Sequence, residues 1–158
     1  MGALRDIIAY IIANYPERLH DELSNARLTK MIYLADWHSA IKSRQQISPI
    51  RWYFDNYGPF VRDVENEISG DPKTFAVVTG TNMYGQPKKT FSLRKGVDRL
   101  DLQPEEKASL DHIIDITKKL YWNDFIRLVY STHPVASSER YTYLNLIEKA
   151  QEYQASRE

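Results

Sequence analysis

The 158-residue sequence contains no cysteine, and it has few glycines. Without cysteine the chain forms no disulfides and has no thiolate for catalysis, which is typical of a reducing compartment, so we expect a cytoplasmic location. The six glycines are scattered, and neither a Gly-x-Gly-x-x-Gly pattern nor a Walker loop is present. The sequence therefore offers no phosphate-binding loop.

An excess of charge of either sign is also missing. Lys and Arg together number 21 and are balanced by 21 Asp and Glu. A balanced chain lacks the positive surface that attracts the phosphates of DNA or RNA, so we expect no nucleic-acid partner. Basic residues do flank aromatic ones, on which bases can stack, and a nucleic-acid-binding regulator stays open as an alternative.

Long hydrophobic runs are absent as well. The N-terminal segment "MGALRDIIAYIIANYPER" is interrupted by Arg5, Asp6 and Asn14. This pattern predicts an amphipathic helix over residues 4–15 and argues against a signal peptide or a membrane span. We expect no association with a membrane.

Groups that carry catalysis or hold metals are sparse. No two of the four histidines lie three or four positions apart, and no Gly-x-Ser-x-Gly motif occurs. The sequence therefore predicts no metal site, no cofactor and no catalytic residue, and we expect a protein that is not an enzyme. His38 is interpreted as a core or interface histidine. A hydrolase that uses His38 or His133 stays open as an alternative.

Apolar periodicity predicts a mostly helical chain in which the strands are grouped together. Grouped strands favour an α+β fold with a small antiparallel sheet of about three strands. No linker or repeat interrupts the chain, so we expect one domain over residues 1–158. The predicted helices span residues 4–15, 28–43, a short segment after Pro59, 103–122, 124–133 and a C-terminal segment that Ser137 or Ser138 caps, with Tyr143, Leu146, Ile147 and Ala150 on one face. The helix over 28–43 has a wide apolar arc, which predicts burial on more than one side and makes it the candidate central helix. The predicted strands span residues 50–55, 74–78 and 89–93.

Aromatic residues are plentiful, and five of them fall in the segment "RWYFDNYGPF" at residues 51–60. Apolar and polar residues alternate here, as in a half-buried strand, which places Trp52 and Phe54 in the core. Gly58 and Pro59 then shape a rigid turn, because glycine tolerates unusual backbone angles and proline restricts them.

The other face of this strand is expected to be exposed. It carries Arg51 and Tyr53, and Tyr57 follows in the turn. Exposed aromatic side chains held beside a rigid turn can anchor a protein partner at a low cost in conformational entropy. We therefore predict that these three residues contact a partner.

The segment "LTKMIYLADWHSAI", followed by "IRWYFDNYGPFVRDVENEI", resembles the SocA-like antitoxin domain, which is also called Panacea. The helical part matches the family at Lys30, Asp36 and His38, and the strand ends in the family's Tyr-Gly-Pro corner. The later segment "NDFIRLVYSTHPV" resembles the family's helix that ends in a Ser/Thr-His pair. The resemblance extends over about residues 4–150.

This resemblance implies a protein that acts by binding. Members are typically antitoxins of bacterial or phage toxin–antitoxin pairs; they neutralise a neighbouring toxin by direct contact, and the domain is associated with phage defence. The implied partner is a cognate protein toxin encoded by the adjacent gene. A proteolytic adaptor that delivers the toxin to a cytoplasmic protease stays open. The candidate partner-binding residues are Lys30, Asp36, His38, Arg51, Tyr53 and Tyr57, and for Lys30 and Asp36 a structural role is equally open.

Overall fold

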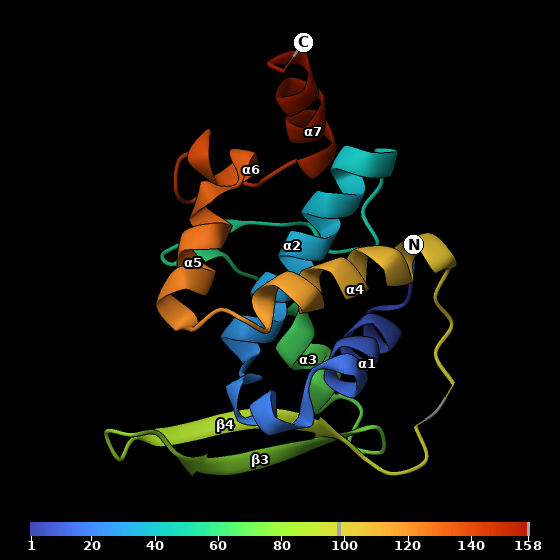
Figure 1. The fold of residues 1–158 in the computed structure, drawn as a ribbon, viewed down its shortest axis with the longest axis vertical. Helices are drawn as coiled ribbons and strands as arrows, with labels where there is room; N and C mark the ends of the chain where they lie inside the picture. The colour runs from blue at the N-terminus through green and yellow to red at the C-terminus, as the bar shows by residue number, and fades with distance from the viewer. Residues whose placement is uncertain (98, 158) are drawn as a thin grey trace.

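The computed structural model describes residues 1–97 and 99–157, which form an α+β fold that is mostly helical, as predicted (Figure 1). No helix in these two ranges has the length and apolar character needed to cross a lipid bilayer. The helices are α1 (Leu4–Asn14), the 3₁₀ helix η1 (Glu17–Glu22), α2 (Asn25–Ser43), α3 (Asp63–Ser69), α4 (Pro104–Thr117), α5 (Trp122–Ser131), α6 (His133–Ala136) and α7 (Leu146–Ala155). The strands are β1 (Phe54–Asp55), β2 (Gly58–Pro59), β3 (Phe75–Thr81) and β4 (Pro87–Leu93).

The strands form two separate antiparallel sheets of two strands each, in place of one sheet of about three. β1 pairs with β2 in a tight corner, and β3 pairs with β4 in a longer hairpin that lies along one end of the molecule (Figure 1). The hairpin strands extend into the predicted loop because the Asn82 side chain accepts hydrogen bonds from the backbone of Tyr84 and Gln86, which closes a short turn.

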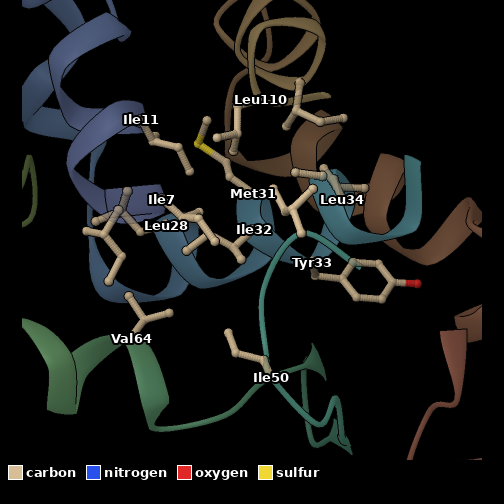
Figure 2. Close-up of a cluster of buried hydrophobic side chains, with 14 of the residues drawn as sticks. Ile7, Ile11, Leu28, Met31, Ile32, Tyr33, Leu34, Ile50, Val64 and Leu110 are labelled. Atoms are coloured by element: carbon tan, nitrogen blue, oxygen red, sulfur yellow. The ribbon is translucent and has the colours of Figure 1, made fainter. Parts of the chain in front are cut away.

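Helix α2 lies at the centre of the fold, in contact with α1, α3, α4 and α7 (Figure 1). Its wide apolar arc was the sequence signal for burial on more than one side. Figure 2 shows aliphatic side chains of α2 meeting Ile7 of α1, Val64 of α3 and Leu110 of α4. The buried Tyr33 ring lies at the edge of this cluster, and its hydroxyl points away from the aliphatic side chains and lies 2.7 Å from the Thr132 hydroxyl (Figure 2). The central position of α2 is therefore confirmed.

The segment over residues 50–55 alternates between buried and more exposed side chains, as predicted. Ile50, Trp52 and Phe54 are buried. Only the end of the segment pairs with β2, and the preceding part pairs with residues 141–144. The Phe54 amide donates to the Thr142 carbonyl at 2.9 Å, and the Leu144 amide donates to the Trp52 carbonyl at 2.8 Å.

This pairing explains an error in the predicted C-terminal helix. Tyr143 was expected within this helix, on one face with Leu146 and Ala150, but it lies before the helix, is 55% exposed and forms an isolated backbone bridge with Tyr53. Backbone groups that pair with another extended segment are not free for helical hydrogen bonds. Helix α7 therefore begins at Leu146, where the Asn145 side chain accepts from the Glu148 amide and caps it in place of Ser137 or Ser138.

A buried arginine joins α2 to the end of α4. Arg27 is 2% exposed, and its Nη2 donates to the carbonyl oxygens of Thr117 and Leu120, each at 2.9 Å. The last carbonyls of a helix have no partner within the helix. The Thr117 carbonyl also accepts from the Leu120 amide at 3.0 Å, so Arg27 adds a donor there and supplies a donor to the Leu120 carbonyl. The guanidinium also lies 4.5 Å from the centroid of the Phe125 ring, which ties α5 to the same point.

We expect Arg27→Met to lower the free energy of unfolding by about 1–3 kcal/mol, because it removes the donor to the Leu120 carbonyl and one donor to the Thr117 carbonyl. Urea denaturation followed by circular dichroism measures this change. The matched control is Arg18→Met in η1, at an exposed arginine, which should change the free energy by less than about 0.5 kcal/mol. Equal effects of the two substitutions would contradict the role given to Arg27.

Candidate functional site

The corner between β1 and β2 depends on a glycine. Gly58 has a φ of +100°, which strains any residue with a Cβ atom. A Cβ at this position would lie 3.5 Å from the Tyr130 ring and 3.8 Å from Cε of Lys30. The glycine therefore brings the corner backbone close to α2 and α5 together. Pro59 follows it as a buried residue that pairs with Phe54.

The Asp36 side chain forms hydrogen bonds with the segment over residues 46–52, which leads to this corner. The carboxylate is fully buried on α2, and its Oδ1 accepts from the backbone amides of Ile47 at 2.8 Å and Ser48 at 2.9 Å. Its Oδ2 accepts from Nε1 of Trp52 at 2.8 Å, from the Ser48 hydroxyl and from the Gln46 side chain. Burial raises the pKa of Asp36 to about 6, and these hydrogen bonds oppose the shift. No face of this carboxylate is open to a partner, so the geometry assigns it a positioning role.

A cavity of about 390 Å³ opens between the corner, α2 and α5. Tyr57 stands at its rim with 80% of its surface exposed, and Trp122 is 45% exposed. The volume lies within the roughly 300–1,000 Å³ of typical binding pockets. The lining residues are mostly aromatic or apolar: Ala26, Lys30, Asp55, Asn56, Tyr57, Phe60, Trp122, Ile126 and Tyr130.

Lys30 is the charged group at the inner side of this cavity. It is only 2% exposed, and its Nζ lies 5.5 Å from the centroid of the Phe60 ring. Burial lowers the pKa of Lys30 from 10.5 to about 8, and the nearby carboxylate of Asp55 opposes that shift. Lys30 is therefore mainly protonated at pH 7, but its charge is poorly solvated.

Arg51 and Tyr53 lie on the neighbouring side of the corner. The guanidinium carbon of Arg51 lies 3.5 Å from the centroid of the Tyr143 ring, and Tyr53 meets the same ring edge-to-face at 5.1 Å. These three side chains line a shallow depression that shares Asp55 and Phe60 with the first cavity. Four candidate residues, Lys30, Arg51, Tyr53 and Tyr57, are thus gathered around one corner.

His38 lies elsewhere, between α2 and α4. Its Nδ1 is 2.9 Å from the Ser109 hydroxyl, and its ring stacks on His112 with 4.4 Å between the centroids. Burial lowers the pKa of His38 to about 4, and the neighbouring His112 adds to the shift. Ser109 is only 3% exposed, so this pair presents no open nucleophile. The structure places His38 in a helix–helix contact, in line with its interpretation as a core or interface histidine.

Sequence reasoning missed the residues that α5 and the C-terminal segment add to the corner. Trp122, Ile126 and Tyr130 repeat every four residues on one face of α5, which was a readable amphipathic signal. The sequence did not indicate which residues this face contacts, because those contacts depend on tertiary packing. Within residues 1–97 and 99–157, no group of three or more His, Asp and Glu is arranged to hold a metal ion.

Comparison with family models gives a match to the family described as "Antitoxin SocA-like, Panacea domain" over residues 28–134. The chain belongs to this SocA-like antitoxin family. The match is narrower than the expected 4–150, since it begins in α2 and ends at the start of α6. It contains the SocA-like corner and most of the cavity, whereas α1 and α7 lie outside it. Comparisons with curated proteins and with solved structures found no significant match.

The buried carboxylate of this SocA-like domain predicts a pH-dependent stability. Because the folded-state pKa of Asp36 is raised from 3.8 to about 6, its stabilising contribution is complete below about pH 3.8 and is lost as pH rises through about 6. We expect the difference in free energy of unfolding between the wild type and Asp36→Asn to fall by up to about 3 kcal/mol from pH 3.5 to pH 7.5. Urea denaturation across this range measures it.

The comparison with Asp36→Asn cancels the contributions of all the ionisable groups that the two proteins share. Asp21→Asn, at a carboxylate whose side chain is 77% exposed, serves as the matched control. A difference between wild type and Asp36→Asn that stays constant with pH, or that grows as pH rises, would show that burial does not dominate the environment of Asp36.

Proposed function

We propose that this SocA-like protein is an antitoxin that neutralises a cognate protein toxin, encoded by the adjacent gene, through direct binding. The observation that carries this proposal is the family match over residues 28–134. The matched range includes the corner and α5, where aromatic side chains are exposed together. Such residues are the commonest anchors of protein interfaces, because they bury a large area with few rotatable bonds.

The exposed aromatic side chains around the corner support this contact face. Tyr57 is 80% exposed, and Tyr143 and Tyr141 are 55% and 59% exposed. A standard interface buries about 800 Å² on each partner, which is roughly a tenth of the 9287 Å² that this chain exposes.

Binding at this face needs little ordering of the chain. The corner is held from inside by the Asp36 carboxylate and from outside by Tyr141, whose amide donates to the Phe54 carbonyl and whose hydroxyl donates to the Asn56 side chain. A surface that is already ordered loses less entropy on association, so more of its contact energy appears as affinity. Neutralisation then follows from steric masking of the toxin, without a bond made or broken by the antitoxin.

Co-expression with the product of the adjacent gene tests the function. We expect that product to arrest growth when expressed alone, and we expect this protein to restore growth and to co-purify with it. A neighbouring product that is harmless alone would overturn the proposal. The half-life of the toxin in the presence of the antitoxin distinguishes masking, which leaves it unchanged or longer, from delivery to a protease, which shortens it.

A matched pair of tyrosines tests the contact face. Tyr57 at the corner and Tyr84 at the tip of the β3–β4 hairpin are both 80% exposed. We expect Tyr57→Ala to weaken toxin binding at least tenfold and Tyr84→Ala to leave it unchanged, as measured by calorimetry on purified partners. The reverse pattern would move the contact face to the hairpin.

A further inference from the structure

The corner cavity contains a buried charge that no ion pair neutralises among the described residues. Lys30 is 2% exposed and takes part in none of the ion pairs formed within residues 1–97 and 99–157. Its ammonium group has three donors and no acceptor, so it needs acceptors from its surroundings. The rings of Phe60, Trp122 and Tyr130 line the same cavity. The nearby Asp55 carboxylate also lines it, but it forms no ion pair with Lys30 among the described residues.

The charges around the cavity favour the binding of an anionic group. Asp55 contributes one negative charge, while Lys30 and Arg140 contribute two positive ones. Arg140 reaches the rim, where its Nε donates to the Asn56 carbonyl at 3.1 Å and its Nη2 lies 3.5 Å from the Tyr130 hydroxyl. The lining itself thus carries one positive and one negative charge, and Arg140 at the rim adds a further positive charge.

The buried Lys30 side chain does not favour the stability of the fold. Burying an ammonium group that forms no ion pair costs free energy, and an apolar side chain of similar length would fill the same space without that cost. The pKa of Lys30, lowered to about 8 by burial, reports the same poor solvation. The buried ammonium group is stabilised most when a ligand supplies a hydrogen-bond acceptor to it.

We propose that the cavity between the corner and α5 receives a carboxylate side chain, Asp or Glu, from the toxin, with Lys30 as its counter-ion. A neighbouring apolar side chain of the toxin packs against the rings of Tyr57 and Trp122, which stand at the rim. This assignment rests on the proposed antitoxin function and adds the chemistry of the recognised residue. The carboxylate accepts hydrogen bonds from the ammonium at the inner side of the cavity, and such charge-assisted hydrogen bonds are stronger than those between neutral groups.

A pair of short peptides tests the assignment without the toxin. The probe is acetyl-Phe-Glu-amide, and its matched control is acetyl-Phe-Gln-amide, which has the same shape and no charge. We expect the Glu peptide to shift the amide signals of Asn56 and Tyr57 and the indole signal of Trp122 in ¹H–¹⁵N correlation spectra, with saturation at millimolar concentration. We expect at least tenfold weaker binding for the Gln peptide. Equal binding of the two peptides, or no shift with either one, would overturn the proposal.

A matched pair of lysines tests the assignment with the toxin. Lys30→Met removes the buried charge, and Lys42→Met makes the same substitution at an exposed position further along α2. In co-expression we expect Lys30→Met to lose growth rescue and co-purification and Lys42→Met to retain both. The melting temperature of Lys30→Met should equal or exceed that of the wild type, because the buried ammonium is gone.

The outcomes separate the two proposals. If the wild type fails to neutralise the neighbouring product, the antitoxin function fails, whatever the peptides show. If the wild type neutralises it and Lys30→Met does so equally well, only the carboxylate assignment fails. If Lys30→Met melts well below the wild type, the ammonium has a structural role and the assignment fails as well.

Discussion

The buried carboxylate of Asp36 is the interaction on which the shape of the exposed corner depends. It joins the central helix α2 to the segment over residues 46–52 through backbone and side-chain donors. Trp52 is one of these donors, and its ring, fully buried against Tyr33, directs the chain toward β1. The buried Asp36 carboxylate thus fixes the positions of Tyr53 and Tyr57, because it fixes the path of the backbone through residues 46–52 that leads to them.

The same corner retains two features that do not favour stability. Gly58 has a backbone conformation that other residues adopt only with strain, and Lys30 is buried without an ion pair among the described residues. Both lie at the cavity between the corner and α5, and the backbone of Gly58 lies close to the Lys30 side chain. Stability and recognition therefore make different demands at this point, and the surrounding core, with α2 at its centre, supplies the stability that the corner lacks.

Local pattern was sufficient for most of the elements. The apolar period of 3.6 located α1, α2 and α3, and the alternation through Ile50, Trp52 and Phe54 placed those three side chains in the core. The helical periodicity gave a wrong prediction at Tyr143, whose segment has helical spacing but pairs with the extended segment that precedes the corner. A periodic pattern reports which side chains share a face, and it does not report whether the backbone has found a partner from 90 residues away.

The sequence by itself determined the helical class, the buried side of α2, the turn at Gly58 and the family resemblance. Each of these depends on residues that lie close together in the chain. Only the tertiary structure decided that Lys30 and Tyr57 share a cavity with Trp122 and that Asp36 and His38 do not belong to it. The reason is physical: Lys30, Asp36 and His38 lie on one helix, and which side of that helix is covered by α4, by the 46–52 segment or by α5 depends on how distant segments pack.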